Sequence, residues 1–175
     1  MPADEHPPSA EVVRAVVDEA ARRSSILWLR YGDEERARPA WHAWREGAVY
    51  VVADARREPR GEGATDGSRD VGGGEPHDAV GKTRTSGTIE QCLPGLGDAT
   101  SATVICRAQD TRARLVTWRA TVRQLTPRSP EWEAAAVALR AERLNAADAA
   151  TLLDRWAEEA VIVRMDPTGE VLDTP

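Results

Sequence analysis

Residues 37–55 read ARPAWHAWREGAVYVVADA and contain two apolar, strand-like runs. A short polar break, Arg45-Glu46-Gly47, separates the two runs. Two β-prone runs around a break that contains glycine predict a β-hairpin. The second run, Ala48–Ala53, is apolar on both faces, which is typical of a strand covered on both sides. Such a hairpin is not stable alone in water, so we expect the rest of the chain to build a barrel or a second sheet around it.

The strand before the break carries the candidate functional side chains. Because side chains alternate along a strand, Trp41 and Ala43 face one side, and His42 and Trp44 face the other. His42 has two interpretations, a packed or hydrogen-bonded strand histidine and a catalytic one. The three histidines have no metal-ligand spacing, so we expect no metal site.

The composition indicates one domain that is large enough for a proper core. The chain has 175 residues, of which 41% are hydrophobic and 30% charged. A net charge of −6 argues against nucleic acid as the main partner. No apolar run approaches the roughly 20 residues that span a membrane. Cys92 and Cys106, in a chain without a signal peptide, favour a reducing cytoplasm over a disulfide framework.

Four further strands and three helices are expected around the hairpin. The strand segments are Ser24–Tyr31, Ser101–Ala108, Leu115–Leu125 and Ala160–Met165. The helical segments run from Ser9 to about Arg23, from Ser129 to about Leu144 and from Asn145 to about Glu159. The strand Ser24–Tyr31 and the two strands of the hairpin should form a meander. Six short strands predict a mainly β (α+β) fold, a small antiparallel barrel with peripheral helices.

The first helix has an apolar stripe that we expect to lie against the domain. Its members are Val12, Val13, Val16, Val17 and Ala20.

A long segment from Arg56 to Glu90 differs in kind from the rest of the single domain. It is rich in glycine, proline and charge, and its apolar residues are few and without period. We predict a flexible insertion, followed by an ordered turn at Leu93–Gly97. Within it, Gly74–Thr83 reads GEPHDAVGKT and partly matches a phosphate-binding P-loop, but Pro76 stands where that motif has its first glycine.

Six tryptophans supply much of the large apolar volume, because the chain has no phenylalanine. Their default place is the core, although one or two could line a pocket for a flat aromatic ligand. No serine-histidine-aspartate elbow, pair of catalytic carboxylates or glycine-rich dinucleotide motif is present in the sequence.

The hairpin also resembles a known family. Arg38–Trp44 and Gly47–Val52 are similar to the second and third strands of the pyridoxamine 5′-phosphate oxidase-like, flavin-binding split-barrel proteins. An R-P-x-W strand, a short turn and a G-x-x-Y/F strand are typical there. The segment from Ser129 to Asn145 and the strand pair before it resemble actinobacterial members of uncertain function. The resemblance implies a six-stranded split barrel and a homodimer that holds two flavin mononucleotides (FMN) between its subunits, with redox chemistry at the flavin.

The same resemblance implies which residues bind the flavin. Arg38, Trp41 and His42 correspond to flavin contacts on the second strand, with Arg38 as a principal anchor. Val52 and Ala53 correspond to contacts on the next strand. The family holds the phosphate with a Ser/Thr-Arg-Lys stretch after that strand. The candidates for this role here are Arg56, Arg57 and Lys82, with Arg84 as a further substitute.

Two functions therefore stay open. The intact hairpin favours an FMN-dependent oxidoreductase of unknown substrate. The phosphate stretch reads Asp54-Ala55-Arg56-Arg57, without the family's Ser/Thr and Lys, and this favours a non-catalytic barrel that serves in dimerisation or ligand binding.

Overall fold

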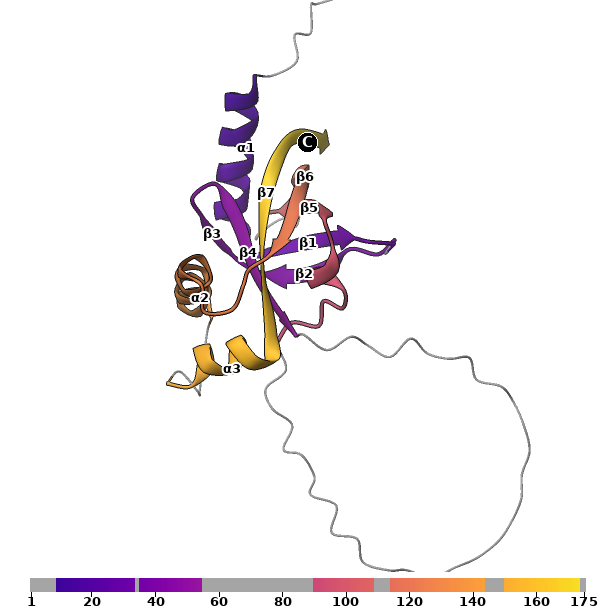
Figure 1. The fold of residues 1–175 in the computed structure, drawn as a ribbon. Helices are drawn as coiled ribbons and strands as arrows, with labels where there is room; N and C mark the ends of the chain where they lie inside the picture. The colour runs from indigo at the N-terminus through magenta and orange to yellow at the C-terminus, as the bar shows by residue number, and fades with distance from the viewer. Residues whose placement is uncertain (1–8, 34, 55–89, 109–113, 144–149, 174–175) are drawn as a thin grey trace, which may run out of the picture.

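A computed structural model of the chain describes residues 9–33, 35–54, 90–108, 114–143 and 150–173 (Figure 1). The predicted insertion, Arg56 to Glu90, lies outside the described residues except for Glu90. In chain order the elements are α1 (Ala10–Arg23), β1 (Ile26–Tyr31), β2 (Arg38–Trp41), β3 (Ala43–Arg45), β4 (Ala48–Asp54), the 3-10 turn η1 (Leu96–Asp98), β5 (Ser101–Arg107), β6 (Arg114–Gln124), α2 (Pro130–Glu142), α3 (Leu152–Glu159) and β7 (Ala160–Asp173).

The seven strands form one antiparallel sheet in the order β2-β1-β5-β6-β7-β4-β3. β2 and β3 are consecutive in the chain, yet they lie at opposite edges of the sheet, and His42 alone separates them. The sheet must therefore curl until its two edges meet at His42. The helices lie outside the curled sheet (Figure 1). The predicted fold class, a mainly β barrel with peripheral helices, is confirmed.

The strand count is seven rather than six because one predicted strand is divided. The segment Arg38–Trp44 was expected to continue through His42, but its first half pairs with β1 and its second half pairs with β4. The predicted three-strand meander is therefore wrong. The alternation of side chains continues unbroken through His42, so the pattern contains no sign of the change of partner.

The hairpin itself is confirmed. β3 and β4 pair with Ala43 opposite Tyr50, and the turn places Glu46 at φ 51° and Gly47 at φ 74°. Positive φ at two consecutive turn residues is the backbone of a type I′ turn, which fits the twist of a hairpin.

Two apolar cores explain why β4 is buried on both faces. Val49 and Val51 face the inside of the barrel, where Trp118 and Leu29 also lie. The opposite face of β4 lies in a second core that α2 and α3 cover. The large members of this second core are Tyr50, Val52, Trp132, Leu139, Leu152 and Trp156.

The α1 helix begins as predicted, but its apolar stripe is narrower than expected. Ser9 caps the helix, since its Oγ accepts from the N–H of Val12 at 3.4 Å. Val13 and Val17 are buried, whereas the side chains of Val12 and Val16 are 51% and 41% exposed. Neighbouring residues lie about 100° apart around a helix. The face of α1 that packs on the sheet includes one pair of valines and leaves the other in solvent.

Two later boundaries also differ from expectation. The α3 helix begins at Leu152 after Thr151, and the predicted cap Asn145 lies outside the described residues. β7 continues past Met165 to Asp173, and Pro167 lies opposite Ala120 beside shifts in register. Proline is tolerated where the ladder is already irregular. The Ser129 cap of α2 and the turn at Leu93–Gly97 are confirmed.

Gln91 joins the β2 edge of the curled sheet to the end of β4, which extends beyond its pairing with β3 and is the opposite edge there. The Trp41 N–H on β2 donates to Gln91 Oε1 at 2.6 Å, and Gln91 Nε2 donates to the Trp41 carbonyl at 2.9 Å. The same Nε2 donates to the Val52 carbonyl on β4 at 2.9 Å, and the Asp54 N–H donates to the Gln91 carbonyl at 3.0 Å. Gln91 therefore binds the backbone of β2 to the backbone of β4.

Within the described part of the chain, no helix has the length and apolar character needed to cross a membrane.

Candidate functional site

A cavity of about 730 Å³ lies where the two edges of the sheet meet. Its wall comes from the end of α1, the start of β1, the junction of β2 and β3, and the end of α2. The large side chains of this wall are Trp41, His42, Trp44, Arg22, Glu142 and Arg143. The volume is in the range of small-molecule and cofactor sites. We call it the junction cavity.

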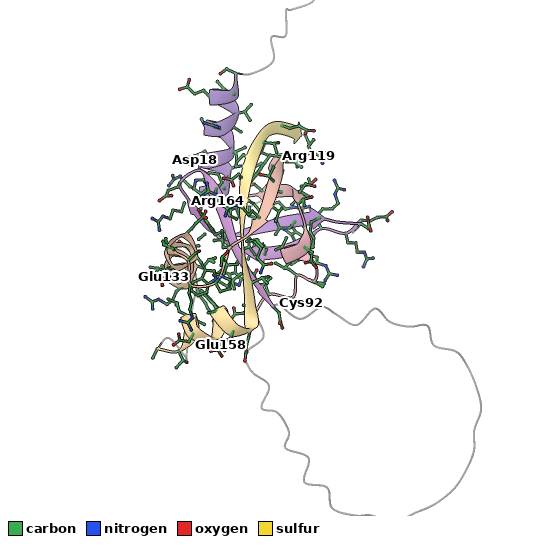
Figure 2. The ribbon with its side chains drawn as sticks, viewed as in Figure 1. Asp18, Cys92, Arg119, Glu133, Glu158 and Arg164 are labelled. Atoms are coloured by element: carbon green, nitrogen blue, oxygen red, sulfur yellow. The ribbon has the colours of Figure 1, made fainter. Side chains whose placement is uncertain are left out.

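Two tryptophans give the junction cavity an aromatic wall. Trp41 is half-buried, and its ring centroid lies 6.4 Å from that of Trp156, at an interplanar angle of 37°. Trp44 is also half-buried, and its Nε1 donates to Asp18 Oδ1 on α1 at 2.6 Å. Figure 2 labels Asp18 on α1. Each indole is therefore held by a residue outside the cavity wall, Trp156 for Trp41 and Asp18 for Trp44.

His42 is buried, and its surroundings favour the neutral form of its imidazole. Only 7% of its surface is exposed, and burial lowers its pKa below the ordinary value. Its Nε2 lies 3.1 Å from the Ala21 carbonyl of α1. Because a carbonyl only accepts, Nε2 carries the proton and Nδ1 has the lone pair. Nδ1 is buried and has no hydrogen-bond partner among the described residues. A buried acceptor without a partner is costly.

Two arginines line the junction cavity, in different environments. Arg22 is exposed and forms two bonds to Asp18, at 2.7 and 3.1 Å. The bond from Arg22 is the main reason why the pKa of the Asp18 carboxyl is lowered. Arg143 has a side chain that is only 13% exposed, and its Nη1 lies 2.9 Å from Glu90 Oε1.

Some of the predicted flavin residues meet at this cavity and others do not. Trp41 and His42 both line it. Val52 and Ala53 are fully buried and belong to the two different cores. Arg38 lies at the other end of β2, opposite Leu29, and is not part of the cavity wall.

The predicted phosphate residues Arg56, Arg57, Lys82 and Arg84 lie outside the described residues, as does the P-loop-like segment. Their role stays a prediction. Among the described residues, no group of three or more His, Cys, Asp or Glu side chains is placed to hold a metal ion.

Sequence reasoning did not identify Arg22, Trp44 and Arg143 as site residues. Arg22 and Arg143 are at the ends of α1 and α2, where basic residues are common for reasons of helix stability alone. Only the tertiary fold brings these helix ends to the β2–β3 junction. For Trp44 the sequence does contain a signal: side chains alternate along a strand, so Trp44 faces the same side as the candidate residue His42.

Comparison with solved structures identifies the class of fold. The heme storage protein HutZ from Vibrio cholerae matches with a TM-score of 0.50 and 10% sequence identity, over 91% of this chain and 93% of that protein. The conserved hypothetical protein Rv2991 from Mycobacterium tuberculosis matches with a TM-score of 0.48 and 13% identity, over 95% of this chain and 84% of that one. No protein-family model matches the sequence, and no curated protein is significantly similar to it.

The likeness to HutZ, at this identity, concerns the fold alone. The chain has a split-barrel fold, in which one curled antiparallel sheet carries its helices outside.

Proposed function

We propose that the protein binds FMN in the junction cavity and acts as a flavin-dependent oxidoreductase of the pyridoxamine 5′-phosphate oxidase-like class. The observation that carries this proposal is the cavity of about 730 Å³ at the β2–β3 junction, lined by two tryptophans and a buried histidine. The resemblance of the hairpin to that class and the split-barrel fold both support it.

The lining residues suit the parts of a flavin. The ring system is flat and apolar on its faces, which matches the exposed portions of the Trp41 and Trp44 indoles. Its edge carries hydrogen-bonding groups, and the polar side chains of the cavity wall, Arg22, Glu142 and Arg143, suit such groups. Bound flavin would supply hydride or electron transfer. The side chains of this chain would hold and orient the ring, and the two arginines would offer positive charge near its polar tail.

We further propose that the protein is a homodimer. The resemblance supports this, and so do the neighbouring valines Val12 (51% exposed) and Val16 (41% exposed) on α1, which line one apolar groove with Leu115. Light scattering at micromolar concentration should give twice the chain mass of 19.0 kDa. A monomer mass would contradict the dimer and leave the cavity proposal in place.

The test of FMN binding is a titration that follows quenching of flavin fluorescence, with two matched tryptophan variants. Trp41→Leu removes an aromatic side chain of the cavity wall. Trp28→Leu removes a half-buried tryptophan of β1 that does not line the cavity. The Cζ atom of Arg107 lies 5.4 Å from the centroid of the Trp28 ring. Loss of a stacking partner costs roughly 1–1.5 kcal/mol, so we expect Trp41→Leu to weaken FMN binding about five- to tenfold. Trp28→Leu should bind as the wild type does, with circular dichroism as the folding control.

Other outcomes would replace the proposal. Quenching that does not saturate in the wild type would contradict flavin binding and favour the non-catalytic barrel. HutZ is described as a heme storage protein, so hemin is the second flat ligand to titrate. A shift of the hemin Soret band that requires His42, without flavin binding, would make the junction cavity a heme site instead.

A further inference from the structure

We infer that the two copies of the proposed homodimer meet along α1, which packs antiparallel against the same helix of the second copy. In this arrangement Val12 of each copy contacts the partner's Val16. This contact rests on the proposed homodimer, and it specifies the surface and the symmetry of that dimer. Two observations carry it, an apolar groove beside α1 and the distribution of charge along the helix.

The groove lies between α1 and the start of β6, and its volume is about 440 Å³. Val12, Ala15 and Val16 of α1 line it together with Leu115 of β6. Both valines are exposed, and they lie four residues apart on adjacent turns of one helix face. A single exposed apolar side chain is ordinary, whereas a contiguous apolar groove is typical of an interaction site. Figure 1 shows the first turns of α1 extending past the ends of the neighbouring strands.

The spacing of the groove residues on α1 is that of a helix that packs on another helix. Val12, Val16, Glu19 and Arg23 follow one another at intervals of four, three and four residues. Ala15 lies on the same face, and its small side chain lets a second helix approach closely. Glu19 and Arg23 form an ion pair at 2.7 Å, so the face is apolar in its first half and charged in its second half. Two copies therefore bury their valines together when the first halves of the two helices overlap.

The charges of α1 permit this contact and favour the antiparallel orientation. The helix has three acidic and three basic side chains, so it is neutral although the chain carries a net charge of −6. Two copies that meet here do not bring an excess of like charge together. In a parallel pair, Glu19 and Arg23 would each lie beside the same residue of the second copy. In the antiparallel pair, Glu19 is level with the partner's Ser9 at the N-terminus of the helix, where a carboxylate is stabilising.

The first experiment measures molar mass by light scattering over a range of protein concentrations. Val16→Glu places a carboxylate in the groove of both copies, and Val137→Glu is the matched control on the exposed face of α2. We expect Val16→Glu to raise the dissociation constant of the dimer at least tenfold, and Val137→Glu to leave it unchanged. Val12→Glu should act as Val16→Glu does, and it replaces that variant if circular dichroism shows that Val16→Glu does not fold. If both α1 variants dimerise with the affinity of the wild type, α1 is not the contact.

The second experiment tests the orientation by cysteine cross-linking. The background is Cys92→Ser, in which the remaining native cysteine, Cys106, is buried. In the antiparallel pair, residue 15 lies about 3 Å along the helix axis from its counterpart, and residue 23 lies about 27 Å from its own. Mild oxidation should therefore give a disulfide-linked dimer with Ala15→Cys and none with Arg23→Cys. Equal cross-linking of both variants would indicate a parallel pair, and cross-linking of neither would contradict the α1 contact.

The outcomes separate this contact from the proposals on which it builds. A monomeric wild type would overturn both the homodimer and the α1 contact. A dimer that persists in Val12→Glu and Val16→Glu would overturn the α1 contact and leave the homodimer standing. The titration with FMN decides the flavin site independently, because neither valine lines the junction cavity.

Discussion

Replacing Gln91 by alanine tests how the two edges of the curled sheet are held together. The Gln91 side chain makes three hydrogen bonds, to the Trp41 N–H, the Trp41 carbonyl and the Val52 carbonyl, at 2.6, 2.9 and 2.9 Å. Each such bond contributes about 1 kcal/mol net, and its loss leaves a partly buried backbone group unpaired. We therefore expect the free energy of unfolding to fall by about 3 kcal/mol. Trp41 should also become less well positioned, which would weaken ligand binding.

Urea unfolding followed by tryptophan fluorescence measures this change. For a domain of this size the slope is roughly 2 kcal/mol/M, so the midpoint should fall by about 1.5 M urea. The control is Gln124→Ala, which removes an exposed glutamine at the end of β6 and should change stability by less than about 0.5 kcal/mol. If Gln91→Ala and Gln124→Ala have the same midpoint, then Gln91 does not hold the sheet edges together.

Three further expectations follow from single residues. Burial lowers the pKa of His42, so the unfolded chain binds the proton more readily than the folded one, and folding stability falls as the pH drops below about 6.5. Between pH 7.5 and pH 5.5 the urea midpoint should therefore fall further in the wild type than in His42→Gln. Equal decreases in the two proteins would contradict the burial of His42. Gly47→Ala should lose about 1 kcal/mol in the same assay because φ is 74° there, and no loss would refute the type I′ turn. Cys92 is exposed, whereas burial raises the pKa of Cys106 to about 11. A thiol reagent should therefore label one cysteine in the folded protein and both cysteines in urea. Rapid labelling of both cysteines under native conditions would show that Cys106 is accessible.

Local signals in the sequence were enough to predict most elements. Ser9 and Ser129 are followed by helices because a serine oxygen can satisfy an N–H of the first turn, and both bonds are present. The glycine of Glu46-Gly47 predicted the hairpin because a type I′ turn needs positive φ. What could not be predicted was the change of partner at His42, because pairing across a curled sheet depends on residues far apart in the chain.

The candidate site was predictable only in part. Trp41 and His42 were expected because they lie on the hairpin, whose local pattern is strong. Gln91 and Arg143 have no local signal in the sequence, because their roles depend on sheet edges and helix ends that only the fold brings together. The resemblance placed Arg38 at the flavin, although the structure places it away from the junction cavity, three residues before Trp41 on β2. Arg38→Ala should therefore leave FMN affinity unchanged if the junction cavity is the site, and a tenfold loss would favour the site that the resemblance implies.

Whether the junction cavity binds flavin against Trp41 can be measured directly by the visible circular dichroism of FMN titrated with the protein. FMN fixed against an indole in an asymmetric site should acquire an induced signal that saturates at one FMN per chain. We expect the signal in the wild type and in Trp28→Leu, and its loss or strong reduction in Trp41→Leu. An absent signal in the wild type, or a full signal in Trp41→Leu, would contradict the assignment of the junction cavity as a flavin site.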